Sequence, residues 1–262
     1  MPSHPKLLDY LAIGFMESGW DVKKLMKDMV MTATYQQNST ATEEHREKDL
    51  ENRFLARGPA NRLTAEMMRD NALAASGLLK EDIGGKSVKP YQPPGLWEIN
   101  NTTYTADTSD EVYRRSLYVL IKRSVPNPTL ATFDGNSRSY CVIRRQKTNT
   151  PLQALVTLND PTYVEASKVL GEEMAKIADP KKAIISAYRK LTGKTPQPEE
   201  LEILLDVRTK EIANFKKNPA KTKGWLEAGY YQIDKTVAPY LVASNAVVAN
   251  LIMNSDATLM KR

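Results

Sequence analysis

Apolar residues recur at helical spacing along most of this 262-residue sequence, and sustained alternation of apolar and polar residues appears nowhere. Spacing of three and four residues places side chains on one face of a helix, whereas a half-buried strand alternates with period two. One clear stripe consists of Leu201, Leu204, Leu205, Ile212 and Phe215. We therefore predict an all-α fold, an irregular multi-helix domain.

Helix starts are marked by a capping residue followed by proline, as in Thr150-Pro151, Asp160-Pro161 and Asp179-Pro180. Threonine and aspartate accept hydrogen bonds from the first free N–H groups of a helix, and proline suits the first helical position. These signals and the apolar stripes predict helices over residues 5–18, 22–33, 64–76 and 111–123, after each of the three prolines, over about 201–215 and from Pro239. We place a domain boundary near Asp179, which gives domains 1–178 and 179–262.

The first two helices are predicted to form an antiparallel hairpin, because the turn between them is short. The second carries a methionine-rich stripe that includes Val22, Leu25, Met26 and Met29. Methionine fills irregular gaps in protein interiors, so we predict that this stripe belongs to the core.

Two long proline-rich segments, residues 84–108 and 125–150, show neither helical nor strand periodicity. Loops of this length within a compact domain are uncommon, and they are usually functional or disordered. Turn-forming and apolar residues are mixed in both segments, which favours ordered loops. The first loop is either a structural strap across the domain or one wall of a ligand groove.

The candidate ligand-binding residues lie in these two loops. They are Asp134, Arg138, Arg144, Arg145 and Asn149 in the second loop, and Tyr91 and Trp97 in the first. An aspartate can act as a base or a metal ligand, and paired arginines can hold a carboxylate or a phosphate. The structural alternative is that one of the adjacent arginines braces the loop through backbone carbonyls, and that Asn149 is a turn residue.

Cys141 is the only cysteine, and it lies beside Val142 and Ile143. We predict that it is a small buried apolar residue rather than a nucleophile. His4 precedes Pro5 and is expected to cap the first helix or to face solvent. One cysteine and two histidines argue against a disulfide or a Cys/His zinc site, and no C-x-x-C-H motif for haem attachment is present. We predict no metal and no cofactor on this segment.

Charge and hydropathy argue against two further classes, nucleic-acid-binding proteins and membrane-spanning proteins. The 37 basic and 31 acidic residues give a net charge of +6, and the basic residues are dispersed, whereas a nucleic-acid footprint needs them clustered on one face. No apolar run approaches the ~18 residues typical of a transmembrane helix. The first residues lack the apolar region of a signal peptide, so we expect none on this chain.

Several long motifs resemble a family of domains of unknown function. They are P-S-H-P-K-L-L-D-Y-L-A from Pro2, E-N-R-F-L-A-R-G-P from Glu51, S-V-K-P-Y-Q-P-P-G-L-W-E from Ser87 and R-R-Q-K-T-N-T-P-L-Q-A-L-V-T-L-N-D-P from Arg144. The family is abundant in planctomycetes and also occurs in verrucomicrobia and bacteroidetes. The resemblance covers nearly the whole chain, in the family's order. The family's domain usually begins earlier, so an N-terminal portion is expected to be missing here.

The resemblance implies a C-terminal part of large exported proteins, often accompanied by cytochrome-like domains, and hence an extracytoplasmic location. It provides no catalytic residue that applies to this sequence. Our first hypothesis is a non-catalytic module for docking or ligand binding in a redox- or polymer-degradation-linked system, with other domains of the parent protein or a protein partner. The alternatives are an enzyme whose site is formed by the 84–108 and 125–150 loops, and nucleic-acid binding.

Overall fold

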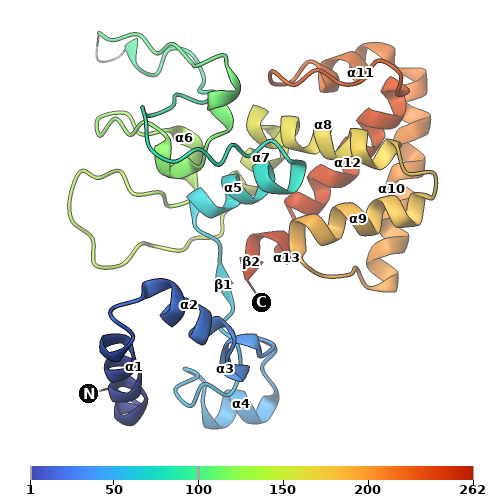
Figure 1. Cartoon of the computed structure of the whole chain (residues 1–262). Coiled ribbons are helices and arrows are strands. Elements are labelled where there is room, and N and C mark those ends of the chain that lie inside the picture. The colour runs from blue at the N-terminus through green and yellow to red at the C-terminus, as the bar shows by residue number, and fades with distance from the viewer. Residues whose placement is uncertain (1, 99–100, 262) are drawn as a thin grey trace. The chain divides into compact units, whose positions relative to one another are not determined.

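The computed structural model describes residues 2–98 and 101–261, which contain thirteen α-helices (Figure 1). The prediction of an all-α fold is confirmed, because the only regular sheet in these ranges pairs the two-residue strands β1 (Asn61–Arg62) and β2 (Met260–Lys261). The chain divides into a smaller unit, residues 1–61 with 260–262, and a larger unit, residues 62–259.

The larger unit contains nine helices within its described residues. They are α5 (Ala65–Ser76), α6 (Pro128–Thr132), α7 (Pro151–Asn159), α8 (Pro161–Ala175), α9 (Pro180–Thr192), α10 (Pro198–Lys217), α11 (Pro219–Leu226), α12 (Pro239–Met253) and α13 (Asp256–Leu259). Every helix from α6 to α12 begins with proline. The missing N–H costs nothing at that position, and the fixed φ of proline suits the first turn. The helix starts at Pro151, Pro161, Pro180 and Pro239 are therefore confirmed.

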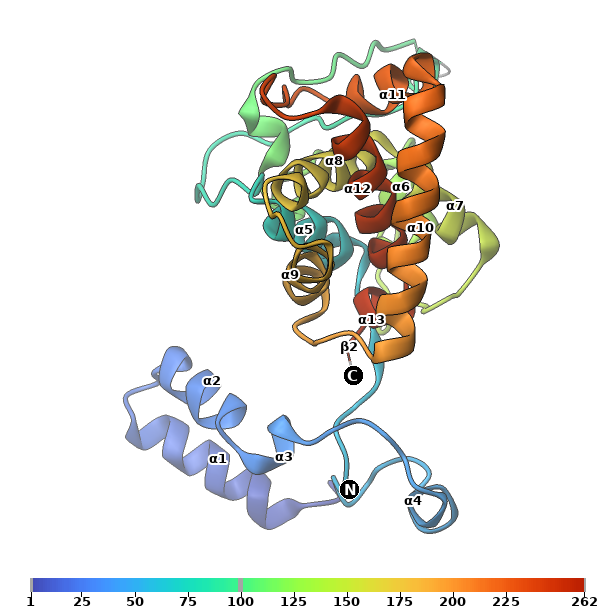
Figure 2. The same cartoon turned by 90° about the vertical axis from the view of Figure 1, so that its right-hand side faces the viewer.

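The core of the larger unit forms where α8 packs along α12, with α5, α9 and α10 around them (Figure 2). Gly171 of α8 permits this close approach, because a Cβ atom there would lie 2.6 Å from both Val242 O and Ala246 N of α12. The main cluster of buried side chains includes Leu170, Met174, Ile184, Val248 and Ile252.

The boundary predicted between residues 178 and 179 lies inside the larger unit, where α8 and α9 pack on each other. Side chains of both helices, Leu170 and Met174 of α8 and Ile184 of α9, share one buried cluster. The division of the chain into domains 1–178 and 179–262 therefore stays a prediction.

The helix predicted over residues 111–123 is wrong. The structure has two short 3₁₀ turns, η2 (Asp110–Tyr113) and η3 (Ser116–Tyr118), and then extended backbone. Bridges join Lys80 to Arg114 and Val88 to Val119, both in parallel. The apolar pattern in this segment still marks burial, because Val112 and Val119 are in the interior. Its backbone, however, forms hydrogen bonds with residues that are distant in sequence and does not continue into the next turn of a helix.

The smaller unit contains α1 (Pro5–Glu17), α2 (Val22–Val30), α3 (Ala33–Gln36) and α4 (Glu43–Lys48). None of these helices has a buried residue. The prediction that the methionine-rich stripe belongs to the core is therefore wrong, since Met26 is 55% and Met29 37% exposed. No helix in residues 2–98 or 101–261 combines the length and the apolar character needed to span a bilayer.

The contact between α8 and α12 can be tested by adding one carbon atom. We expect Gly171→Ala to lower the free energy of unfolding by about 1–3 kcal/mol, because overpacking displaces backbone atoms. Gly224→Ala in α11 is the matched control, since its added Cβ would meet nothing within 4 Å. Urea unfolding followed by circular dichroism measures both variants, and equal stability of the two would contradict this packing.

Candidate functional site

The first candidate site is a set of exposed apolar side chains on α1, α2 and α3 and in the turns between them. We call it the apolar hairpin surface. It consists of Leu7, Leu8, Tyr10, Ile13, Met16, Trp20, Val22, Met26, Met29, Val30, Met31 and Tyr35. Large exposed apolar side chains in such number are a feature of surfaces that interact with other molecules in soluble proteins.

Local interactions fix the ends of these helices. The side chain of Asp21 accepts a hydrogen bond of 3.0 Å from Lys24 N at the start of α2. Phe15 and Trp20 pack edge to face across the turn, with ring centroids 5.2 Å apart. Caps alone do not stabilise short helices, because isolated helices below about 12–15 residues are marginal in water, and burial of an apolar face supplies most of the stability. With 13 and 9 residues, α1 and α2 lack that burial.

The second candidate site lies in the larger unit, where buried arginines hold irregular segments in place. Arg69 of α5 is only 4% exposed. Its Nη1 donates to Arg114 O at 2.9 Å and to Ser116 Oγ at 3.2 Å, and its Nη2 donates to Val112 O at 2.5 Å. The neighbouring Asp70 accepts a hydrogen bond of 2.7 Å from Ser116 N. Together these two residues of α5 bind the backbone of residues 112–116.

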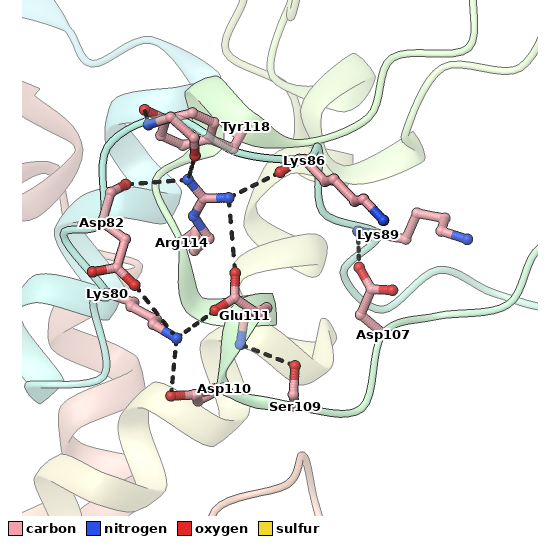
Figure 3. A network of polar contacts seen from close by, with 11 residues as sticks. Lys80, Asp82, Lys86, Lys89, Asp107, Ser109, Asp110, Glu111, Arg114 and Tyr118 are labelled. Atoms are coloured by element: carbon pink, nitrogen blue, oxygen red, sulfur yellow. Dashed lines mark hydrogen bonds and ion pairs between the residues drawn. The ribbon is translucent and has the colours of Figure 1, made fainter.

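Arg114 then binds the next segment. Its guanidinium donates to Lys86 O at 2.9 Å, to Asp82 O at 3.2 Å and to Gly84 O, and it lies 4.0 Å over the ring of Tyr118 (Figure 3). A planar guanidinium with several donors suits such a set of carbonyls. The turn formed by residues 82–86 is therefore attached to α5 through two successive arginines.

Lys80 links the same turn to η2. Its ammonium lies 3.5 Å from Asp82 and 3.2 Å from Asp110, and it donates to Glu111 (Figure 3). The hydrogen bond with Glu111 raises the pKa of Lys80 above its ordinary value. Glu111 also lies 3.7 Å from Arg114 Nη1, so the two basic residues share one carboxylate.

These segments border an open cavity of about 640 Å³, lined by Asp82, residues 84–88 and 106–109, Glu111 and Arg114. Its acidic groups already have donors: Asp107 accepts from Lys89 N at 2.7 Å, and Asp82 and Glu111 pair with Lys80. A general base must be available to accept a proton from substrate. The carboxylates at this cavity instead hold its walls together.

The predicted site residues of the second loop lie near the surface. Asp134, at a positive φ of 59°, accepts hydrogen bonds from Thr148 N at 2.7 Å and from Thr148 Oγ1, and so closes the loop at its base. Arg138, Arg144 and Asn149 are exposed. The Nη1 atom of Arg145 lies 2.7 Å from Glu66 Oε2. Burial acts to raise the pKa of Glu66, but the hydrogen bonds that the carboxylate accepts and the charge of Arg145 together outweigh burial and lower the pKa.

The two aromatic candidates of the first loop lie elsewhere. Trp97 packs against Tyr104 with ring centroids 4.9 Å apart, and Lys122 lies 4.3 Å over its indole. Tyr91 lines a cavity with Arg69 and Pro90. Asp134 and Arg145 line a separate cavity of about 30 Å³ in which neither aromatic residue takes part. The ligand-binding roles of these residues stay predictions.

Two single residues differ from expectation. Cys141 is exposed, so the prediction of a buried cysteine is wrong. Apolar neighbours do not bury it, because Val142 and Ile143 are exposed with it. The side chain of His4 does not cap α1; its Nε2 lies 2.7 Å from Arg53 O. The described residues hold no group of three or more His, Cys, Asp or Glu side chains placed for a metal ion, and the absence of a cofactor stays a prediction.

The sequence analysis did not single out Arg69, Arg114, Glu165, Lys168 or Glu172, although all five are buried. A signal for three of them was present. Glu165, Lys168 and Glu172 follow one another at spacings of three and four residues within α8, so they share one helix face. Charged side chains that recur on one face of an otherwise apolar helix need polar partners from another segment.

Comparison with known proteins adds one finding. A family model described as PSD1, a protein of unknown function (DUF1553), matches residues 1–208. The chain belongs to this family. The resemblance expected from the sequence motifs is therefore confirmed as to family. No curated protein and no solved structure matches this DUF1553 chain.

The role of Arg114 in holding the turn of residues 82–86 in this DUF1553 chain can be tested with a substitution that keeps the charge. We expect Arg114→Lys to lower the free energy of unfolding by about 1–3 kcal/mol, because an ammonium cannot reach all three carbonyls that the guanidinium binds. The amides of Lys80 and Val88, which donate to Tyr113 O and Tyr118 O, should then exchange faster with deuterium. The exposed neighbour Arg115→Lys is the control, and equal effects of the two substitutions would contradict the role of Arg114.

Proposed function

We propose that this DUF1553 chain is a non-catalytic helical module that docks onto a protein partner through the apolar hairpin surface. The partner offers an apolar helical face or groove, either on another domain of the same longer protein or on a separate chain. The single observation that carries the proposal is that α1 and α2 expose their apolar faces and bury no residue. Helices this short gain their stability from such a partner surface.

The charges on the hairpin favour a protein partner over an anionic membrane. Lipid-binding amphipathic helices carry basic residues along their polar face. The hairpin carries charges of both signs, since Asp9, Glu17 and Asp28 lie on the same two helices as four lysines, and Lys24 already pairs with Asp28 at 2.8 Å. Mixed charge around an apolar patch is the pattern of a protein interface, with an apolar centre and a polar rim.

The wider setting of the proposal rests on the sequence motifs. The family resemblance supports an exported parent protein in a redox- or polymer-degradation-linked system. The enzyme alternative receives less support, because the carboxylates of Asp82, Asp107 and Glu111 around the cavity of about 640 Å³ already pair with other groups of its walls. Nucleic-acid binding also receives less support, since opposite charges at that cavity pair with one another.

Site-specific photo-cross-linking in the native host tests the docking proposal. A photoreactive amino acid in place of Tyr10, which is 74% exposed, should give one discrete adduct with a protein segment other than this chain. A probe in place of Lys48 in α4 is the control position. Met26→Glu should reduce the Tyr10 adduct roughly tenfold, which corresponds to about 1.4 kcal/mol of binding free energy. The same substitution should leave the urea unfolding of the larger unit unchanged.

Other outcomes would overturn the proposal. An adduct of twice the chain's mass would show self-association. Sedimentation with phosphatidylglycerol vesicles would show lipid binding. An adduct whose yield is unaffected by Met26→Glu, or the absence of any adduct, would show that the apolar hairpin surface does not dock onto a protein.

A further inference from the structure

A second, smaller cavity in the larger unit has features of a ligand site that the docking proposal does not use. It has a volume of about 230 Å³. Its walls come from four segments that are distant in sequence: Pro90 and Tyr91, Val112 and Tyr113, the first turns of α8 with Glu165, and residues 228–230. Arg69 completes the lining.

The polar group at this cavity is a largely buried carboxylate, and all the hydrogen bonds it accepts from described residues go to one of its two oxygens. Glu165 is only 4% exposed. Its Oε1 accepts three hydrogen bonds, from Tyr113 Oη at 2.8 Å, Tyr230 N at 2.5 Å and Tyr231 N at 2.6 Å. No residue in the described ranges donates a hydrogen bond to Oε2. This oxygen is not among the fully buried polar atoms that lack a partner, so it keeps contact with solvent and can accept a hydrogen bond from a ligand in the cavity.

Residues 226–231 are shaped to meet this carboxylate. Gly229 has a φ of 72°, and a Cβ atom there would overlap the Glu165 carboxylate. Lys168, one turn further along α8, donates to Leu226 O at 3.2 Å, Ala228 O at 2.6 Å and Tyr231 O at 2.7 Å. The segment is thus held on α8 by two buried charges, and this wall of the cavity is formed before any ligand binds.

Aromatic rings supply the rest of the recognition surface. Tyr91, Tyr113 and Tyr230 all line the cavity, and Tyr91 and Tyr230 are 42% and 43% exposed. Partly exposed tyrosines offer an apolar face together with a polar hydroxyl. Ligand sites in proteins commonly combine such an apolar lining with a few placed polar groups.

The lining carries one charge of each sign, so it favours a ligand without net charge. The Glu165 carboxylate would repel an anion, and the Arg69 guanidinium would repel a cation. The volume is below the ~300 Å³ at which pockets for drug-sized molecules begin, so it accommodates about one ring. A neutral ring with hydroxyl groups meets all three conditions.

We propose that this cavity binds a neutral, hydroxyl-bearing ring of the kind found in a monosaccharide unit. One hydroxyl donates to Glu165 Oε2, and an apolar face of the ring stacks on Tyr91 or Tyr230. The site is independent of the apolar hairpin surface, so either proposal stands if the other fails.

Ligand-observed NMR with the full chain tests this inference. The probes are glucose, galactose, mannose, xylose and N-acetylglucosamine, with choline as a cationic probe and gluconate as an anionic one. We expect saturable binding of at least one neutral sugar and weaker binding of both charged probes. Absence of binding by all five sugars, or tighter binding of choline or gluconate, would overturn the assignment.

Variants then locate the site. Tyr91→Ala and Tyr230→Ala should each weaken sugar binding roughly tenfold or more, because the sugar ring loses a stacking face. Tyr140→Ala is the matched control, since Tyr140 is exposed and lies outside the cavity lining. Glu165→Gln keeps one acceptor for the backbone N–H groups and removes the free carboxylate oxygen, so it should weaken binding while the melting temperature shows whether the fold persists. Binding that is unchanged in both tyrosine variants would contradict the site.

Discussion

Every buried N–H and C=O group in an irregular segment needs a partner, and this requirement governs the larger unit of the protein. The backbone groups of its long loops find few such partners, because the loops take part in neither a helix nor an extended sheet. Buried charged side chains supply the partners instead. Arg69 binds residues 112–116, Arg114 binds residues 82–86, and Glu165 and Lys168 bind residues 226–231. Glu165 and Lys168 belong to α8, and Arg69 belongs to α5, which packs on α8, so the core positions these three side chains.

This arrangement explains why the loops are ordered and why they form cavities. A guanidinium that spans several carbonyls fixes the direction of a turn as well as its position, which an apolar contact does not. The burial that makes these contacts specific also carries a cost, since it lowers the pKa of Arg69 and of Lys168 by disfavouring their charged forms. The smaller unit contrasts with this pattern: Asp21 caps α2, but neither α1 nor α2 has a buried residue, which is the basis for assigning this unit a docking role.

The features that could be predicted correctly from the sequence depend on residues that are close to one another along the chain. Caps followed by proline at Thr150, Asp160 and Asp179 lie within one turn of the helices they start. The segment 111–123 has a helical pattern as well, but Arg69 and Asp70, more than 40 residues away, bind its backbone groups. An arginine that braces a loop through carbonyls was expected at Arg144 or Arg145 and is found at Arg114. Cys141 has apolar neighbours in sequence, but no other element covers them.

Hydrogen exchange of the wild-type chain and an Arg69→Met variant tests this account most directly. Methionine keeps much of the side-chain volume and removes the donors that bind Val112 O and Arg114 O. The account predicts faster exchange at the Lys80, Val88 and Ser116 amides, whose hydrogen bonds depend on this segment, while amides within α8 and α12 keep their protection. Unchanged exchange at those three amides would show that the buried arginine does not hold the loops in place.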